Sequence, residues 1–178
     1  MSKERVWFHI ILTTYGAWLP GDPRGFRTRH HREHVEGDYK HPPPVGAYEM
    51  RHRQAKKLRS LSAVIIPVLL RPVVGTAMRD RFQQAGGDVL AVSVNGQHVH
   101  VQVQLEDCDA RYPTGDAKRH AWFEMKKSDW TRKLWGSRSK IVRIKDRTHQ
   151  QNVYDYILDH ANKGAWVWSA LRDMNSHT

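Results

Sequence analysis

The chain has 178 residues, which is the usual length of one domain with a single core and too short for two domains of ordinary size. Lysine and arginine number 29 against 18 aspartates and glutamates, so the formal net charge is +11. Such a surface attracts polyanions; nucleic acid is the expected partner, and an anionic membrane surface is the weaker alternative. The single cysteine, Cys108, excludes an internal disulfide and a zinc site of several thiolates, and we expect a cytoplasmic protein. The most apolar segment, 64–75, is short and interrupted by prolines, so no membrane span is expected.

The first half of the chain predicts a strand, a long basic loop and two helices. Residues 5–14 (RVWFHIILTT) are rich in β-branched and aromatic types, which is typical of a buried strand. Residues 15–46 are rich in glycine, proline, histidine and arginine, a composition typical of a long basic loop. Residues 47–60 have the pattern of a basic amphipathic helix, and a second helical pattern is firmest over 73–85 before Gly86 ends it.

The middle of the chain predicts a hairpin and a helix. Residues 88–94 (DVLAVSV) and 97–105 (QHVHVQVQL) read as two strands, and the Asn-Gly pair between them is the strongest short hairpin signal. After a polar loop, Asp116 is suited to cap a helix that continues to about Leu134.

The last part predicts one more strand and one more helix. Residues 140–145 (KIVRIK) alternate as a strand. Thr148 and Gln151 fit a capping box that opens a helix to about Asn162, and Gly164 stands where a helix-ending glycine belongs.

The order of elements is therefore strand, helix, strand, strand, helix, strand, helix. Antiparallel strands with helices packed on one face satisfy this order and make an α+β ferredoxin-like sandwich. We expect residues 1–178 to form a single domain of this kind, with a long basic loop at about 15–46 and a frayed C-terminal tail.

Two histidines share one side of the strand predicted at 97–105. Because side chains alternate along a strand, His98 and His100 point to one side and the valines between them to the other. Two imidazoles placed in this way can coordinate one metal ion. The alternative is an ordinary half-buried strand, since a chain with 12 histidines contains a His-X-His pattern about once by chance.

The last predicted helix places a hydroxyl near a third imidazole. At 3.6 residues per turn, Tyr156 and His160 are neighbours on one helix face, together with Val153 and Ile157. Tyr156 is therefore the candidate nucleophile, whereas Tyr154 points to a different side and is the poorer candidate. The alternative is that Tyr156 is a core aromatic and His160 a cation favoured at a helix C-terminus.

Three segments carry a resemblance to a known family. Residues 94–100 (VNGQHVH) read as valine, a turn and His-X-His, and residues 156–164 (YILDHANKG) begin with the candidate tyrosine. Residues 9–22 (HIILTTYGAWLPGD) form a distinctive opening. In these segments the sequence resembles the HUH single-strand endonucleases, and among them the single-tyrosine transposases of the REP-associated and insertion-sequence type. The resemblance covers nearly the whole chain in order.

The resemblance implies a mechanism and a set of site residues. Tyr156 would be the nucleophile, and a divalent ion, Mg²⁺ or Mn²⁺, would lie between His98, His100 and His160. The family has Asn or Gln, followed by Pro, where this chain has His160-Ala161, so His160 is a chemical substitute. The turn before the first histidine also departs from the family's Met-Pro-Asn or Met-Pro-Asp. The implied activity is cleavage and transfer of single-stranded DNA beside hairpins or palindromic repeats, through a 5′-phosphotyrosine.

Binding of a single strand needs basic side chains for phosphates and flat side chains for unpaired bases. Trp18 or Phe26 is expected to stack on bases. The candidates for phosphate contact are Arg24, Arg27, Arg29, Arg51, Arg53, Lys56, Lys57, Lys126 and Lys127. Any one of them alone would be read as a solvated surface charge, and only the net charge of +11 favours nucleic acid. The histidines within 30–41 are interpreted as part of a nucleic-acid arm rather than as a second metal site.

Two rival functions stay open. A replication initiator or relaxase-like nickase shares the His-X-His pattern, but it is disfavoured by the short chain and by the lack of a second tyrosine near Tyr156 on the same helix face. A catalytically silent regulator that binds hairpin DNA and derives from such an enzyme shares every feature except the chemistry. Family members work as monomers or as dimers that share active sites, so a homodimer is a further candidate.

Overall fold

The computed structural model describes residues 4–26, 34–38, 40–106 and 109–175. The chain divides into two compact units, one formed by residues 1–14 and 64–178 and the other by residues 15–63. The first unit contains a five-stranded sheet and its helices, and the second contains helix α1 (Glu49–Leu58). That the two units act as one domain stays a prediction.

The first unit is built on an antiparallel sheet whose strand order is β4-β1-β3-β2-β5. The strands are β1 (Arg5–Thr14), β2 (Asp88–Val94), β3 (His98–Glu106), β4 (Trp135–Arg143) and β5 (Trp166–Ser169). The first four have the order of a ferredoxin-like sandwich, which confirms the predicted α+β class. β5 pairs with the edge of β2 and was not predicted, because four residues behind a glycine give too short a pattern.

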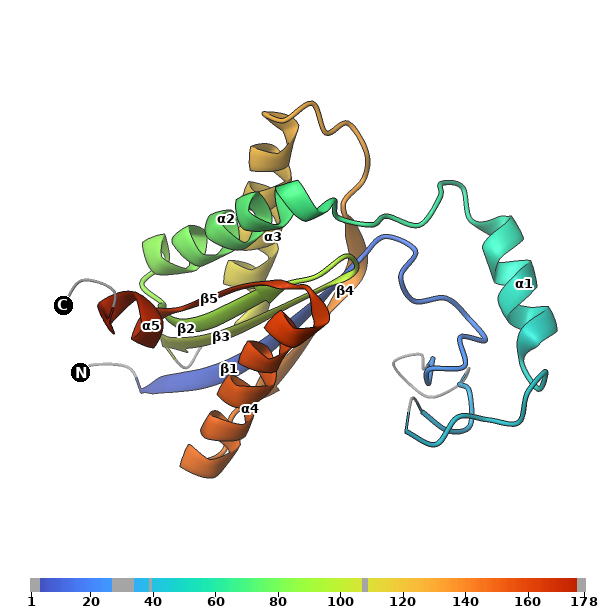
Figure 1. The fold of residues 1–178 in the computed structure, drawn as a ribbon, viewed down its shortest axis with the longest axis horizontal. Coiled ribbons are helices and arrows are strands. Elements are labelled where there is room, and N and C mark those ends of the chain that lie inside the picture. Colours follow the sequence, from blue (N-terminus) through green and yellow to red (C-terminus); the bar gives the residue numbers. More distant parts are fainter. Residues whose placement is uncertain (1–3, 27–33, 39, 107–108, 176–178) are drawn as a thin grey trace. The chain divides into compact units, whose positions relative to one another are not determined.

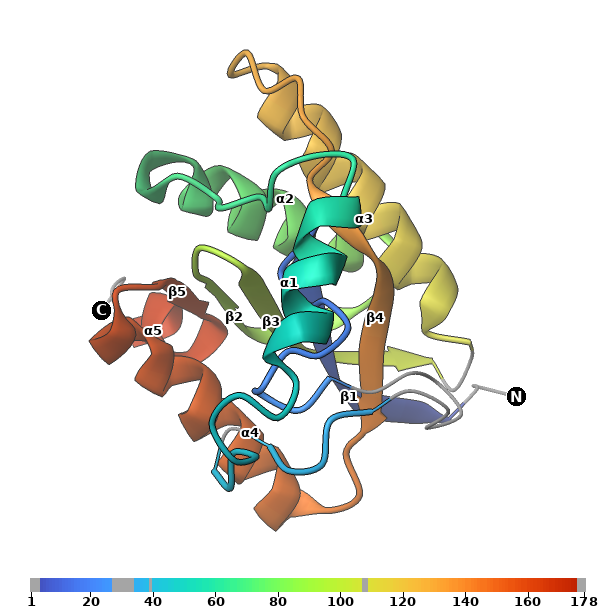
Figure 2. The ribbon, with the colours of Figure 1, turned by 90° about the vertical axis from the view of Figure 1, so that its right-hand side faces the viewer.

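Helices cover both faces of this sheet (Figures 1 and 2). The helical segments are a 3₁₀ turn η1 (Val68–Leu70), α2 (Arg71–Gln84), α3 (Arg111–Lys126), α4 (Arg147–Asp159), a second 3₁₀ turn η2 (His160–Lys163) and α5 (Ala170–Asn175). α2 and α3 lie on one face and α4 on the other. The expectation that all helices pack on one face is therefore wrong. Within the described ranges, no helix is both long enough and apolar enough to cross a bilayer.

Strand alternation explains the two layers. Val99, Val101 and Val103 are fully buried on the valine face of β3, which faces the end of α2. The opposite face is less apolar, and there Ile157 of α4 packs into a cluster that includes Ala91 of β2. One sheet face thus supplies the main core, while the other has room for polar side chains beneath α4.

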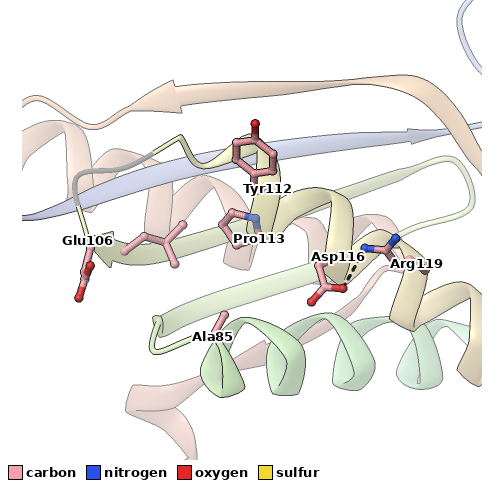
Figure 3. A pocket seen from close by; sticks show the side chains of 7 residues that line it. Ala85, Glu106, Tyr112, Pro113, Asp116 and Arg119 are labelled. Carbon is pink, nitrogen blue, oxygen red and sulfur yellow. Dashed lines mark hydrogen bonds and ion pairs between the residues drawn. The ribbon is translucent and has the colours of Figure 1, made fainter.

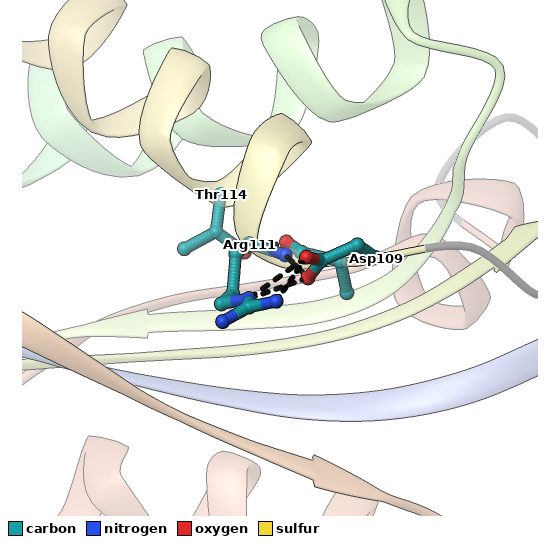
Figure 4. Close-up of polar contacts among 4 residues, drawn as sticks. Asp109, Arg111 and Thr114 are labelled. Carbon is teal, nitrogen blue, oxygen red and sulfur yellow. Dashed lines mark hydrogen bonds and ion pairs between the residues drawn. The ribbon is translucent and has the colours of Figure 1, made fainter.

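Helix α3 starts five residues before the predicted cap. Asp109 accepts a hydrogen bond from the backbone N–H of Arg111 at 3.1 Å and pairs with its guanidinium, while Thr114 Oγ1 donates to Ala110 O at 2.6 Å (Figure 4). Pro113 is tolerated because the first-turn N–H groups of a helix have no intrahelical acceptor. Asp116 is therefore a residue of the helix interior, and it pairs with Arg81 Nε of α2 at 2.6 Å.

The predicted end of α3 and start of β4 also move. α3 ends at Lys126, not near Leu134, and Asp129 adopts a left-handed backbone with φ of 60°. The indole N–H groups of Trp122 and Trp130 both donate to Arg132 O, at 3.2 and 2.8 Å, and hold the following loop against the helix. β4 begins at Trp135 instead of 140, since the pairing with β1 already starts at Thr14.

Two predicted turns are confirmed in place. The β2–β3 hairpin turns at Asn95, whose Oδ1 accepts from the backbone N–H groups of Gln97 and His98 at 2.9 and 2.7 Å. Gly164 ends the last helical segment in the left-handed conformation, with φ of 73°. The predicted cap of α4 is wrong: Asp146, not Thr148, accepts the backbone N–H of His149 at 2.8 Å.

Candidate functional site

Three strands bring polar side chains together on the sheet face that α4 covers. In the pairing register, His100 of β3 lies opposite Ser93 of β2, and His9 of β1 lies opposite Gln102 of β3. His98 stands two residues before His100 and therefore on the same side. His9, Ser93, His100 and Gln102 are all buried, so the sheet positions these groups in an interior away from bulk water.

The closest polar contact joins two histidines from different strands. His9 Nε2 and His100 Nδ1 are 3.1 Å apart, a hydrogen bond between buried rings. The ring of His100 also stacks on that of His160, with centroids 4.6 Å apart and planes 26° from parallel. His160 in turn contacts Ser93 Oγ through Nδ1 at 3.0 Å.

Helix α4 places Tyr156 and His160 beside these histidines because its buried residues fix which helix face meets the sheet. Val153 and Ile157 are buried one turn apart and anchor the helix on the sheet. Tyr156 lies one position before Ile157, and His160 begins the 3₁₀ turn that continues the helix. The predicted neighbour relation of Tyr156 and His160 is present, with ring centroids 4.6 Å apart in an edge-on arrangement.

Tyr156 is the exposed member of an aromatic group. Its ring also lies edge-on to His100, at 5.3 Å between centroids, and to His9, at 6.1 Å. The residue keeps 45% of its surface exposed, whereas His100 and His160 are each 6% exposed. A phosphate can therefore reach the tyrosine from solvent, while the imidazoles around it are held by packing.

Tyr154 has a different role. Its hydroxyl and Ser169 Oγ of β5 are 2.7 Å apart, and its ring packs against the cluster around Ile157. Tyr154 therefore ties α4 to the edge strand, as expected for a structural tyrosine.

Burial keeps the histidines of the site neutral. It lowers the pKa of His9 from 6.5 to about 4, with Lys140 as the next cause. Burial, followed by the nearby His160, lowers the pKa of His100 to about 2. Burial also lowers the pKa of His160, followed by Lys163. Neutral imidazoles each have one nitrogen with a lone pair, which is the form that binds a metal ion.

The imidazoles have nitrogens suited to bind a metal ion, but among the described residues they do not form a complete metal site. In His100 and His160, Nδ1 already contacts a buried partner, so Nε2 is the nitrogen left for a ligand, as in protein metal sites where the second ring nitrogen is held by hydrogen bonding. Within the described residues, however, no group of three or more His, Cys, Asp or Glu side chains is arranged as a ready metal site. The predicted set of His98, His100 and His160 stays a prediction.

The basic residues predicted to contact phosphates lie in both units of the chain, and two of them lie outside the described residues. Arg27 and Arg29 lie outside the described residues. In the second unit, Arg24 is held by Asp22, with Nε to Oδ1 at 2.9 Å, and its guanidinium lies 4.8 Å above the ring centre of Trp18. The four basic residues of α1 are exposed, and Arg53 pairs with Glu49 at 2.6 Å: they are Arg51, Arg53, Lys56 and Lys57.

In the first unit, Lys126 and Lys127 are exposed at the end of α3. Lys126 Nζ lies 4.6 Å above the ring centre of Trp122, and the neighbouring Phe123 is 50% exposed. Lys127 pairs with Glu124 at 2.7 Å. Flat and basic side chains therefore adjoin here, which is the combination that single strands need.

A separate open pocket lies at the other end of β3 (Figure 3). Its volume is about 460 Å³, and it is lined by Ala85, Leu105, Glu106, Tyr112, Pro113, Asp116 and Arg119. The lining mixes both charges, and none of the predicted site residues takes part. The histidine group and this pocket are different sites.

Sequence reasoning missed His9, Ser93 and Gln102. A lone histidine within an apolar strand and a serine in a buried strand give no local signal of function. Only the strand register reveals that His9 and Ser93 lie beside His100, although the opening of the chain at His9 is part of the family resemblance. Alternation along β3 already places Gln102 on the face of His100, but it gave Gln102 no role.

The fold of the chain is similar to that of two solved structures. No family model and no curated protein matches the sequence. The chain is similar to a solved structure of a REP-associated tyrosine transposase bound to a REP hairpin, with 12% identity and a TM-score of 0.46 over 92% of this chain and 71% of that one. It is also similar to a protein from Deinococcus radiodurans R1 with a provisional assignment as a transposase, with 14% identity and a TM-score of 0.41 over 88% and 91%. These likenesses concern the path of the chain.

Proposed function

We propose that the protein is a metal-dependent endonuclease and strand transferase for single-stranded DNA, which acts through a 5′-phosphotyrosine on Tyr156 beside DNA hairpins. One observation carries the proposal: an exposed tyrosine lies edge-on to three buried imidazoles, His9, His100 and His160. A solvent-accessible nucleophile next to buried nitrogen ligands is the arrangement that phosphoryl transfer needs. The alternative, that Tyr156 is only an aromatic residue of the core, is disfavoured because its side chain is exposed.

The chain's own residues supply the covalent step. The phenol of Tyr156 gives its proton to water at its exposed side, and its oxygen attacks the phosphorus as the bond from phosphorus to the 3′ oxygen breaks. The 3′ oxygen leaves and takes up a proton, so one strand ends in a 3′-hydroxyl and the other in a 5′-phosphotyrosine. A second 3′-hydroxyl reverses the step and joins the new strand, and no ATP is needed because the bond energy is conserved.

A divalent ion, Mg²⁺ or Mn²⁺, held by His100 and His160 with His98 as the third predicted ligand, would neutralise the phosphate charge and orient the scissile bond. His160 keeps its ring orientation through Ser93 and its stacking on His100. Tyr156 is kept close by the helix that both residues share.

Strand binding draws on basic and flat side chains. Lys126 and Lys127 with Phe123 offer such a surface in the first unit, and the exposed cations of α1 offer another in the second. The net charge of +11 supports a polyanionic partner.

Incubation with hairpin-bearing single strands and Mn²⁺, followed by denaturing electrophoresis, tests the proposal. We expect a covalent protein–DNA adduct that is lost in Tyr156→Phe and kept in Tyr154→Phe, because Tyr154 is engaged with Ser169. Adduct formation by Tyr156→Phe would refute the nucleophile. Hairpin binding without an adduct in the wild type would instead support the silent regulator.

A further inference from the structure

We propose that His9 is a positioning residue for this site: its Nε2 accepts a hydrogen bond from Nδ1–H of His100 and so keeps Nε2 of His100 as the ligand-binding nitrogen. The catalytic consequence rests on the proposed function, whereas the hydrogen bond itself can be tested without it. His9 is placed on β1, and His100 on β3, so the contact also joins two central strands.

The geometry leaves little room for another partner. His9 Nε2 and His100 Nδ1 are 3.1 Å apart, and the two residues are 8% and 6% exposed. Water is therefore nearly excluded, and each ring nitrogen needs a protein partner or carries a desolvation cost. Two neutral imidazoles make one such bond only if one nitrogen carries the proton and the other accepts it.

The buried amide of Gln102 favours one direction for the hydrogen bond between His9 and His100. It lies opposite His9 in the strand register and is fully buried, and its Nε2 donates to Gln150 O at 2.9 Å. Its Oε1 is the buried side-chain atom without a hydrogen-bond partner among the described residues. A lone acceptor on the residue opposite His9 favours the His9 tautomer with its proton on Nδ1, because that N–H can satisfy Oε1 through one buried water. His9 Nε2 is then unprotonated and accepts from His100.

The second imidazole follows the same pattern. His160 Nδ1 contacts Ser93 Oγ at 3.0 Å, and Ser93 is 1% exposed. His100 and His160 thus each have a buried partner on Nδ1, and where Nδ1 donates to that partner, Nε2 keeps the lone pair that a ligand atom needs. In metal proteins such partners fix the ring orientation, and their loss weakens metal binding by about 10–100-fold.

The test uses the full chain with the substitutions His9→Phe, which cannot accept a hydrogen bond, and His9→Gln, whose amide oxygen can. His120→Gln, on α3, is the matched control. Nitrogen-15 NMR of the histidine rings reports the tautomers, and titration calorimetry with Mn²⁺ alone reports affinity. We expect the Nδ1–H tautomer of His100 in the wild type and its loss in His9→Phe, with Mn²⁺ affinity lowered about 10–100-fold and partly restored in His9→Gln.

Turnover gives a second readout, because a positioning role lowers kcat and leaves KM for the DNA unchanged. An unchanged His100 tautomer in a folded His9→Phe protein would overturn the inference, and so would an Nε2–H tautomer in the wild type. The tautomer result stands even if the wild type forms no covalent adduct, so failure of the proposed function and failure of this inference are distinguishable. If His9→Phe does not fold, the wild-type spectrum alone decides: an Nδ1–H tautomer of His100 supports the inference and an Nε2–H tautomer overturns it.

Discussion

Acid is expected to destabilise the protein through its buried histidines before the carboxyl groups contribute. The pKa of His9 falls from 6.5 to about 4 in the folded protein, mainly through burial. Above pH 6.5 the ring is neutral in the folded and unfolded chains, so it imposes no cost. Between pH 6.5 and pH 4 the unfolded chain binds a proton that the folded chain does not, and stability falls as the pH falls.

The size of the effect follows from the same values. Each fully developed proton difference costs about 1.4 kcal/mol per pH unit, so His9 alone removes about 3 kcal/mol by pH 4. His100, with its pKa lowered to about 2, adds a loss of the same sign over a wider window. A domain of ordinary stability has about 5–15 kcal/mol in total, so the combined effect is large.

Urea unfolding at steps from pH 7.5 to pH 4 measures this dependence. Carboxyl groups such as Asp22 have pKa values lowered from 3.8, so their contribution belongs to a lower pH window. We expect the free energy of unfolding of His9→Gln to depend less steeply on pH than the wild type, by up to about 1.4 kcal/mol per pH unit. His120→Gln serves as the control. Equal slopes for His9→Gln and the wild type would refute the assignment of His9 as a buried neutral ring.

Further predictions concern packing, metal and DNA. Gly75→Ala places a Cβ 1.9 Å from Trp166 Cζ3 and should destabilise the protein by at least about 1–3 kcal/mol in urea unfolding. Ile157→Ala empties the cluster beneath α4 and should cost about 2–5 kcal/mol, measured in the same way. Chelation by EDTA should abolish the covalent adduct on electrophoresis and leave hairpin binding intact. Lys126→Ser and Lys127→Ser should each weaken hairpin binding and reduce the slope of log affinity against log salt by about 1, by fluorescence anisotropy.

Most of the sheet could be predicted because its strands carry strong local signals. The alternating pattern of β3 and the Asn-Gly turn before it predict that His98 and His100 lie on the same face of one strand. The start of α3 could not be predicted, since Pro113 reads as a breaker unless Asp109 is known to satisfy the first turn. The position of α4 on the opposite face is likewise a matter of packing between distant segments.

The candidate site also contains residues whose proximity could be predicted from the sequence and residues whose proximity could not. Tyr156 and His160 lie on one helix, so their proximity follows from helical spacing alone. His9, by contrast, is separated from His100 by 91 positions and meets it only through strand pairing. Ser93 depends on strand pairing in the same way, and sequence periodicity carries no information on which strands are neighbours. Gln102 shares the face of His100 through alternation along β3, and only its position opposite His9 depends on pairing.

Mass spectrometry of the trapped protein–DNA adduct tests the central claim most directly. Trypsin should release residues 148–163, a peptide that holds both Tyr154 and Tyr156, so fragment ions can locate the nucleotide on one of them. We predict a 5′-phosphonucleotide on Tyr156 and an unmodified Tyr154. A nucleotide on Tyr154 or on any other residue would contradict the account.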